Sequence, residues 1–378
     1  TFIASSAASD VYKRQVEVAG RAIGSATREE FAARLGEEQR QIREAFTSAP
    51  APALLSHHEA KERRLRLDWN AGAPDRPERL GVRVVRSQPI GELLDYVDWT
   101  PFFHVWELRG SYPRILDHPE HGTAARELLE QARATLDRLA DEEALHATAV
   151  WGLFPANSVG DDIVLYTDEA RSGELARLPT LRQQRQPRGK RPTLALADFV
   201  APRTGGPPDY VGAFALTTGL GLDRLVERLR AEHDEFAAIM ATALADRLAE
   251  AFAERLHETV RREWGHGGDE RLTPREMIAE RYRGIRPAPG YPACPDHSDK
   301  RTLWRLLDVE AGTGIRLTEN CAMQPAASIS GLYLAHPRAR YFAVGKIGRD
   351  QVEDYARRKG IPLREAERWL RPNLAYDP

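Results

Sequence analysis

Residues 280–300 read ERYRGIRPAPGYPACPDHSDK, and prolines occupy positions 287, 289, 292 and 295 of this stretch. Because proline fixes φ at about −65° and lacks a backbone N–H, the stretch can form neither a helix nor a central strand. We expect a stiff, irregular loop. Its recognition groups are a guanidinium, an accessible backbone, a phenol and a thiol, supplied by Arg286, Gly290, Tyr291 and Cys294. A rigid loop with such groups can bind a ligand at little ordering cost.

The composition limits the classes of protein to consider. The 378 residues suffice for one large domain or two ordinary ones. The formal charge of −2 argues against a general nucleic-acid binder. The two cysteines, Cys294 and Cys321, cannot form a disulfide framework, so we expect a cytoplasmic protein. No apolar run approaches the roughly 20 residues that span a bilayer, so we expect no membrane contact.

Helical and β-rich patterns alternate irregularly along the chain. Helical periodicity covers residues 27–46, 125–139, 222–231 and 236–264, and a Pro/Ala-rich linker at 48–55 follows the first of these. Short β-rich runs occur at 149–154, 162–166 and 211–216. The runs 328–334 and 341–347 are joined by so few residues that they predict an antiparallel hairpin. Because regular βαβ alternation is missing, the expected fold class is α+β.

Four stretches of the chain are similar to a single protein family. They are RPAPGYPACPDH at 286–297, DWTPFF at 98–103, GLFPAN at 152–157, and the end of the chain from Leu317 through DQVEDYARRKG at 350–360. Together they resemble the C-terminal activation domain of cobalamin-dependent methionine synthase, from about residue 35 onward. The first stretch resembles the S-adenosylmethionine-binding loop of that domain. The resemblance implies a single curved domain with a twisted antiparallel sheet and flanking helices.

The resemblance also implies a division of the chain. Residues 1–15 match nothing in the family, and 16–34 resemble the end of the preceding cobalamin-binding domain. Residues 35–75 would be a helix and linker, and 76–378 the S-adenosylmethionine-binding activation domain. We therefore expect the C-terminal piece of a longer enzyme, with a separately encoded subunit as the alternative.

The family's binding residues map onto eight positions of this chain. By resemblance, the S-adenosylmethionine pocket comprises Asp98, Glu250, Glu280, Arg286, Ala288, Tyr291, Tyr341 and the backbone of Phe342. The ligand's α-carboxylate suits the forked donors of Arg286, and its α-ammonium needs an acceptor such as Asp98. Tyr291 and Tyr341 supply flat rings and hydroxyls.

Spacing alone leaves two of these carboxylates open. Thr273-Pro274-Arg275-Glu276 is a capping box that predicts a short helix to about Arg281, with Glu276 and Glu280 on one face. Glu280 would then be either a surface carboxylate or a ligand contact. In the helix predicted over 236–264, Glu250 lies roughly opposite the apolar seam, on a face shared with His257. It can be solvated or face the ligand.

Other motifs do not complete a site. Gly219-Leu220-Gly221 lacks the third glycine of a dinucleotide fingerprint and predicts a turn at a helix start. Cys294-x-x-His297 and His118-x-x-His121 offer too few ligands for a structural zinc, so we predict no metal site. We also find no convincing catalytic triad and predict no catalytic side chain.

In the family, the activation domain rescues inactive cob(II)alamin by reductive methylation to methylcobalamin. An electron comes from flavodoxin or an equivalent donor and the methyl group from S-adenosylmethionine, while the protein supplies proximity and orientation. This chain would thus be part of a methyltransferase, unable to make methionine alone. It would contact cobalamin in trans or through the missing upstream domain. The alternatives are a stand-alone corrinoid-protein reactivase and a non-enzymatic docking module for flavodoxin and a cobalamin domain.

The densest basic run, from Arg177 to Arg191, contains Arg182, Arg185, Arg188 and Lys190 and no acidic residue. It can be a solvated loop or a patch that docks an acidic flavodoxin.

Overall fold

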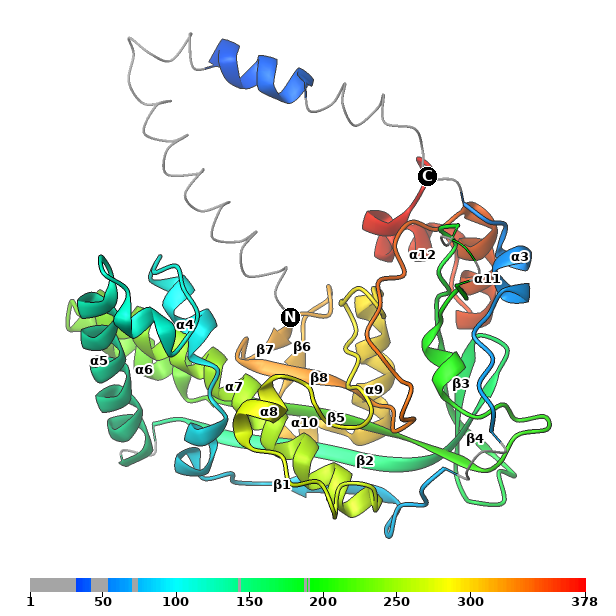
Figure 1. Cartoon of the computed structure of the whole chain (residues 1–378), viewed down its shortest axis with the longest axis horizontal. Helices are drawn as coiled ribbons and strands as arrows, with labels where there is room; N and C mark the ends of the chain where they lie inside the picture. Colours follow the sequence, from blue (N-terminus) through cyan, green and yellow to red (C-terminus); the bar gives the residue numbers. More distant parts are fainter. Residues whose placement is uncertain (1–31, 42–53, 70–73, 142–143, 187–188, 190) are drawn as a thin grey trace. The chain divides into compact units, whose positions relative to one another are not determined.

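The computed structural model describes residues 32–41, 54–69, 74–141, 144–186, 189 and 191–378 (Figure 1). The chain divides into two compact units. One contains Trp99–Arg126 together with the residues up to Pro52, and the other contains Ala53–Asp98 and Glu127–Pro378. Within the described ranges, every helix is too short or too polar to cross a bilayer.

An antiparallel sheet forms the centre of the larger unit. Its strands are β1 (Gly81–Val85), β2 (His146–Val159), β3 (Asp162–Tyr166), β4 (Glu174–Pro179), β5 (Asp209–Leu220) and β8 (Ser328–Tyr333). Their order is β4-β3-β2-β5-β8, and β1 and β3 pair with successive parts of the same edge of β2. A separate two-stranded sheet contains β6 (Arg316–Leu317) and β7 (Met323–Gln324). The predicted α+β class with an antiparallel sheet is confirmed.

Helices flank this sheet. In the larger unit they are α3 (His57–Glu62), α6 (Leu222–Ala231), α7 (Glu235–Trp264), α8 (Pro274–Ile278), α9 (Lys300–Leu307), α10 (Val309–Thr313), α11 (Arg349–Lys359) and α12 (Leu363–Trp369). Short 3-10 turns are η1 (Ile90–Tyr96), η3 (Leu196–Phe199), η4 (His297–Asp299) and η5 (Arg371–Asn373). The helices predicted over 222–231 and 236–264 are α6 and α7. Gly221, with φ +94°, is the N-cap of α6, as predicted for a turn at a helix start.

The smaller unit contains α4 (Trp99–Val105) and η2 (Arg114–Asp117). The Tyr112 N–H donates to the Thr100 hydroxyl at 3.1 Å, and the Phe103 ring stacks on Tyr112 at 6.4 Å. Helix α5 (Gly122–Asp141) confirms the helix predicted over 125–139. Residues 32–41 are helical, in agreement with the pattern over 27–46, whose remaining residues lie outside the described ranges.

The two faces of the sheet carry different layers of helix. Ala213 and Ala215 of β5 belong to an apolar core that includes Leu303, Leu307 and Val309 of α9 and α10. Neighbouring strand residues point to opposite faces, so Phe214 lies on the other side. There its ring stacks on Tyr333 at 4.5 Å, and Tyr333 stacks on His257 of α7 at 4.9 Å. The sheet is therefore covered by α9 and α10 on one face and by α7 on the other (Figure 1).

Helix α7 packs against β5 and β8 of the sheet and against α6 and η1. Its predicted apolar seam is buried throughout: Met240, Leu244, Leu248, Phe252, Leu256 and Val260. The Thr218 hydroxyl of β5 donates to the Ala245 carbonyl at 2.8 Å. Asp234 caps the first turn, and Gly265, with φ +98°, ends the helix. The thirty-residue helix is thus held on its apolar seam and, through His257, on the face opposite that seam.

The predicted hairpin of 328–334 and 341–347 is wrong. Residues 328–333 form β8, but 341–346 form no strand. Beside β8 lies the proline-rich loop: Ile285 and Leu334 exchange two backbone hydrogen bonds of 3.0 Å, and the Leu332 N–H donates to the Pro287 carbonyl at 2.9 Å. The open edge of β8 is thus satisfied by a segment more than forty residues earlier in the chain, which leaves no position there for 341–347.

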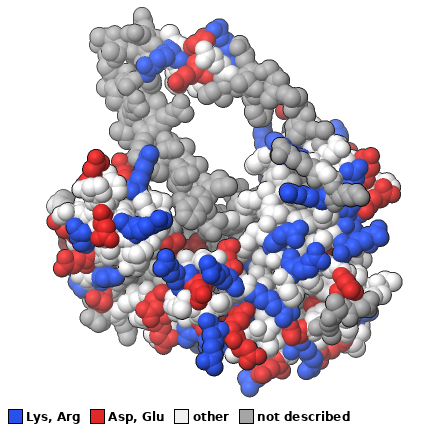
Figure 2. All heavy atoms as spheres, viewed as in Figure 1, with Lys and Arg blue, Asp and Glu red and all other residues white. Residues whose placement is uncertain are grey.

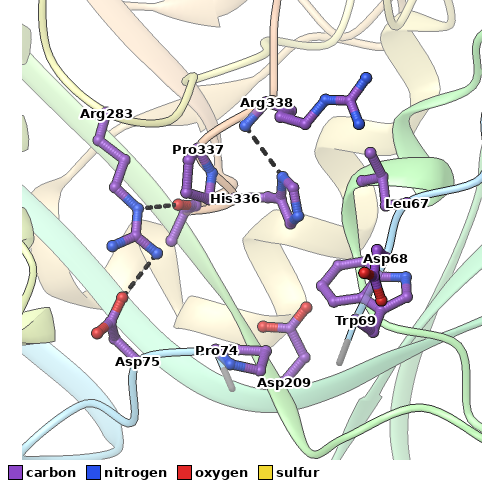
Figure 3. A pocket seen from close by; sticks show the side chains of 11 residues that line it. Leu67, Asp68, Trp69, Pro74, Asp75, Asp209, Arg283, His336, Pro337 and Arg338 are labelled. Atoms are coloured by element: carbon purple, nitrogen blue, oxygen red, sulfur yellow. Dashed lines mark hydrogen bonds and ion pairs between the residues drawn. The ribbon is translucent and has the colours of Figure 1, made fainter. Parts of the chain in front are cut away.

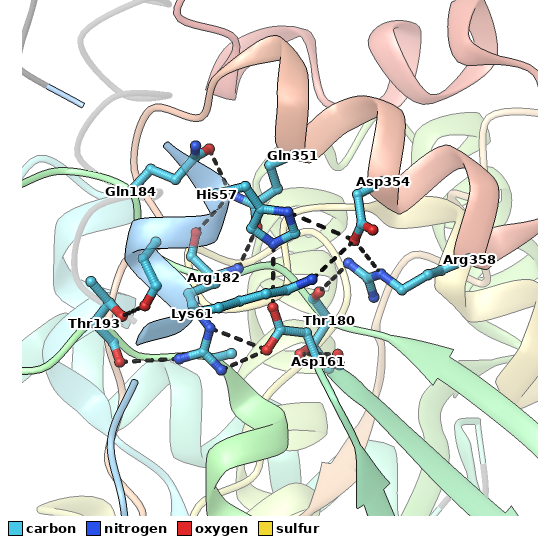
Figure 4. A network of polar contacts seen from close by, with 12 residues as sticks. His57, Lys61, Asp161, Thr180, Arg182, Gln184, Thr193, Gln351, Asp354 and Arg358 are labelled. Carbon is cyan, nitrogen blue, oxygen red and sulfur yellow. Dashed lines mark hydrogen bonds and ion pairs between the residues drawn. The ribbon is translucent and has the colours of Figure 1, made fainter. Parts of the chain in front are cut away.

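Both predictions for the basic run 177–191, a solvated loop and a patch that docks an acidic flavodoxin, are wrong for Arg182. Arg182 is 0% exposed, and its Nη2 lies 2.6 Å from Asp161 Oδ1 and 2.7 Å from Asp198 Oδ1. Figure 4 shows Arg182 turned inward between α3 and the sheet, beside His57 and Asp161. Burial opposes ionisation, but the His57 hydrogen bond and the Arg182 charge hold the pKa of Asp161 well below its ordinary value.

Other members of the run differ. Arg177 pairs with Asp162 at 2.9 Å and with Glu174 at 2.7 Å, whereas Arg185 is exposed. Arg188 and Lys190 lie outside the described residues. The acids that neutralise Arg177 and Arg182 come mainly from other strands and turns. The sequence of the run therefore could not show that these arginines are paired. On the face in Figure 2, charges of both signs are interspersed over the described surface, in accord with the net charge of −2.

Replacing Arg182 tests whether it is structural. Arg182→Ala leaves the buried carboxylates of Asp161 and Asp198 without their arginine, and should lower the free energy of unfolding by about 3–5 kcal/mol. Arg185→Ala, at an exposed position of the same run, should change it by less than about 0.5 kcal/mol. Urea unfolding of both variants measures the difference. Equal, small effects would contradict the structural role of Arg182.

Candidate functional site

The proline-rich loop folds back on itself through its few backbone donors. The Gly290 N–H donates to the Cys294 carbonyl at 2.7 Å, the Cys294 N–H to the Tyr291 carbonyl at 2.9 Å, and the Tyr291 N–H to the Ala288 carbonyl at 3.2 Å. The Val344 N–H also donates to Pro292 at 2.8 Å. The predicted irregular loop is confirmed, and it is held between β8 and residues 341–347.

Gly290 allows the loop to pack closely against the turn before α9. Its φ is +98°, and a Cβ at this position would lie 2.1 Å from Cε1 of His297. The His297 ring is itself held by a 3.0 Å contact between Nδ1 and the Nζ of Lys300. Glycine is therefore required here both for backbone conformation and for the space occupied by the imidazole.

Arg286 leaves the loop toward helix α7. Its Nη2 donates to Glu254 Oε1 at 2.5 Å, and the two side chains are only 12% and 9% exposed. Its backbone N–H donates to the Tyr341 hydroxyl at 3.0 Å. Although burial opposes the charge, the Glu254 carboxylate raises the pKa of Arg286 well above its ordinary value. The guanidinium is therefore charged and fixed beneath the loop.

A second layer of polar groups lies next to this pair. The His257 ring meets Tyr282 edge-on at 4.5 Å, and the Arg261 guanidinium lies over the Tyr282 ring at 4.6 Å. Burial lowers the pKa of His257 well below its ordinary value, and the charges of Arg261 and Arg286 act in the same direction. His257 is therefore neutral. Burial also raises the pKa values of Tyr282 and Tyr333, so both phenols are protonated.

Several buried polar atoms of this region have no protein hydrogen-bond partner among the described residues. They are Arg286 Nη1, Glu254 Oε2, His257 Nδ1 and the hydroxyls of Tyr282 and Tyr333. Buried polar atoms are nearly always hydrogen-bonded, so unpaired donors and acceptors gathered in one place have capacity for a ligand or ordered water. The arrangement can bind polar, charged groups; its buried histidine and phenols are not ionised for acid-base work.

Two predicted carboxylates lie near Arg286. Glu250 is one helical turn before Glu254 on α7. The pKa of Tyr291 is raised first by the burial of its own ring and then by the negative charge of Glu250. The face that carries Glu250 and His257 therefore turns toward the loop. Partial burial raises the pKa of Glu280. The Arg286 charge lowers this pKa and the Glu254 charge raises it, so Glu280 lies within electrostatic reach of both members of the ion pair.

The predicted helical position of Glu280 is wrong. Helix α8 has the predicted capping box, with Thr273 and Glu276 bonded reciprocally, but it ends at Ile278. Glu280 has φ +55° and does not share a helix face with Glu276. The chain turns after Ala279, because it must enter the loop that pairs with β8.

The remaining predicted residues are placed as follows. Tyr291 and Tyr341 are 46% and 41% exposed, so both rings are accessible from solvent. Ala288 is half-buried, and the Phe342 ring packs 6.4 Å from Phe199, toward the core. Asp98 follows η1, whose Tyr96 hydroxyl donates to Glu258 of α7 at 2.6 Å. The ligand roles of all eight residues stay predictions.

A cavity of about 440 Å³ lies beyond the Ile285–Leu334 pairing and contains none of the predicted site residues. Figure 3 shows Arg283 paired with Asp75, at 2.6 Å, on one wall and Trp69 beside His336 on another. Burial raises the pKa of Asp209, at its base, to about 6. Arg283 also donates to the Ala335 carbonyl at 2.9 Å, so this cavity and the Arg286 cluster share the same loop and strand.

No three histidine, cysteine or acidic side chains in the described part of the chain are grouped as a metal site requires. Cys294 instead donates to Asp299 at 3.5 Å, and burial raises the pKa of its thiol well above the ordinary value. His118 and His121 stack on each other at 4.9 Å.

Comparison with known proteins identifies the family of this chain. Residues 89–360 match the family described as the activation domain of vitamin B12 dependent methionine synthase. The chain belongs to this family. A solved relative, the crystal structure of the MetH reactivation domain bound to AdoHcy, is 51% identical, with a TM-score of 0.84. The match covers 86% of this chain and 99% of that chain. The resemblance inferred from the four sequence stretches is confirmed.

Sequence reasoning missed Glu254, whose carboxylate forms the ion pair with Arg286. A signal was present, because Glu250, Glu254 and Glu258 recur every four residues along α7, on one side of the helix. Such a row is usually solvated. The missing information was that the loop, over thirty residues later, covers this face of α7.

Substitution of glycines with left-handed backbone tests the packing of the loop. Gly345→Ala, where φ is +74° and nothing lies within 4 Å of the new Cβ, should cost about 1–2 kcal/mol of stability from backbone conformation alone. Gly290→Ala should cost about 1–3 kcal/mol more, because the methyl group displaces His297. Chemical denaturation measures both. Adding His297→Ala to Gly290→Ala should recover most of the excess; no recovery would contradict the close-packing explanation.

Proposed function

We propose that this chain binds S-adenosylmethionine on the surface formed by the Arg286 loop, the Glu250–Glu254 face of α7 and Tyr341. The observation that carries the proposal is the buried, charged Arg286 beneath a proline-stiffened loop, beside unpaired polar atoms. The relative of 51% identity is bound to AdoHcy, the product that remains when S-adenosylmethionine gives up its methyl group. Both ligands carry the same α-carboxylate and α-ammonium groups.

The chemistry of the ligand suits these residues. Arg286 would pair the α-carboxylate, and Asp98 and Glu280 would accept from the α-ammonium. Glu250 would lie near the positive sulfonium end, and Tyr291 and Tyr341 would provide flat, accessible surfaces for the ligand. The backbone of Ala288 and Phe342 would complete the pocket. None of these groups needs to act as a nucleophile.

We further propose that bound S-adenosylmethionine gives its methyl group to cobalamin held by another domain, in the reductive methylation of cob(II)alamin to methylcobalamin. Cobalamin would supply the nucleophilic metal, and flavodoxin or an equivalent protein the electron. The chain's own residues would hold the ligand and orient its methyl group. Transfer of labelled methyl from S-adenosylmethionine to a separately supplied cobalamin domain under a reducing donor tests this step.

The carboxylate role of Arg286 can be tested with two ligands. Loss of a charge-assisted pair costs on the order of 2–5 kcal/mol, or about 30- to several-thousand-fold in affinity. Arg286→Ala should therefore weaken S-adenosylmethionine far more than its decarboxylated analogue, and Arg286→Lys should be intermediate, since it keeps the charge without the fork. Calorimetry measures both affinities. Equal losses would show that Arg286 only supports the loop.

The pH dependence of binding tests Glu280. Partial burial raises its pKa from the ordinary value of 4.5. Only the ionised carboxylate attracts an ammonium group, so the affinity for S-adenosylmethionine should fall as the pH falls through this raised pKa, and level off above it. Titrations from about pH 5 to about pH 8 should show the fall in the wild type and a flatter profile in Glu280→Gln. Identical profiles would remove Glu280 from the binding site.

A further inference from the structure

Among the described residues, Glu254 is the only side chain that forms an ion pair with Arg286, and the two side chains are 12% and 9% exposed. Nη2 of the arginine donates to Oε1 of the glutamate, whereas Nη1 and Oε2 are buried without a partner in the described part of the chain. The contact therefore occupies one terminal nitrogen of the guanidinium and leaves further donor capacity.

The loop alone cannot fix the guanidinium. Pro287 biases the backbone of Arg286 toward an extended conformation, and the N–H bond to Tyr341 holds its main chain. The arginine side chain still has several rotatable bonds beyond Cα. Rotation about these bonds is restricted only when the guanidinium itself makes contacts. Glu254 provides such a contact from α7, which is anchored to the sheet by its buried seam and the Thr218–Ala245 bond.

Glu254 could instead compete with a ligand's carboxylate for the same guanidinium. Its own burial argues against this. If a ligand displaced Glu254 from Arg286, its carboxylate would remain buried without its cation, which is strongly unfavourable. The pair is thus more stable when it persists as the ligand binds, with the ligand's carboxylate at the donors that Glu254 leaves free.

From this geometry we propose that Glu254 is a positioning residue: it holds the Arg286 guanidinium in the orientation that recognises the α-carboxylate of the ligand. The inference rests on the proposed function, because it assumes that this surface binds S-adenosylmethionine. It adds a residue that makes no ligand contact itself and sets the preference for carboxylate-bearing ligands.

The test measures that preference, defined as the affinity for S-adenosylmethionine divided by the affinity for its decarboxylated analogue, by calorimetry on the full chain. Glu254→Met removes the anchor at similar volume and should lower the preference by at least about tenfold. Glu254→Gln should retain most of it, because the amide oxygen still accepts from Nη2. If Glu254→Met does not fold, Glu254→Asp serves instead. Its side chain keeps the negative charge but is one methylene shorter, so the carboxylate lies farther from Arg286 and the preference should fall several-fold.

Glu270→Gln is the matched control. Glu270 forms an ion pair of 2.8 Å with Arg261, another buried arginine, which lies on α7. Its replacement should lower the melting temperature without changing the ligand preference. This separates general loss of stability from loss of orientation.

Four results would overturn the inference. Tighter binding of S-adenosylmethionine by Glu254→Met would make Glu254 a competitor, and equal weakening of both ligands would make it merely structural. A preference that survives in both Glu254→Met and Glu254→Asp would overturn this inference alone. If the wild type binds both ligands equally, the proposed role of Arg286 fails, and the inference fails with it.

Discussion

A buried ion pair between Arg286 and Glu254 connects the proline-rich loop to helix α7, and the arrangement of the candidate site depends on it. Prolines remove backbone donors from the loop, so few main-chain bonds are available to attach it. A charged guanidinium beneath such a loop requires an opposite charge close by, since an unpaired buried charge is very costly. The position of the loop on α7 is therefore restricted to one in which Arg286 meets Glu254.

The edge of the sheet provides the second attachment. Strand β8 would expose unpaired backbone groups, and Ile285 and Pro287 take up part of that edge. The candidate site consequently lies along the side of an antiparallel sheet, next to a helix that covers one face. This differs from doubly wound folds, in which ligands bind beyond the carboxyl ends of parallel strands. Membership of the methionine synthase activation-domain family agrees with this architecture.

Beneath the pair, aromatic rings link the sheet to the helix. Phe214, Tyr333 and His257 stack in succession, and Tyr282 closes the group edge-on. Burial keeps His257 neutral and the phenols protonated, so this layer adds no charge of its own. Among the described residues, two fixed cations lie beside these rings: Arg286, paired with Glu254, and Arg261, paired with Glu270. The layer is thus suited to holding Arg286 in place rather than to chemistry on a substrate.

The sequence by itself determined the features that depend on near neighbours. Proline spacing fixed the stiff loop, the capping box fixed the start of α8, and apolar periodicity fixed α7 and its seam. Its motifs also identified the family and nominated Arg286. Only the tertiary structure decided which acid meets each buried arginine: Glu254 is 32 residues from Arg286, and Asp161 and Asp198 are 21 and 16 from Arg182. It also decided that the loop, and not 341–347, lies beside β8. Local conformation follows from adjacent residues, whereas charge pairing and strand pairing are chosen by the packing of the whole chain.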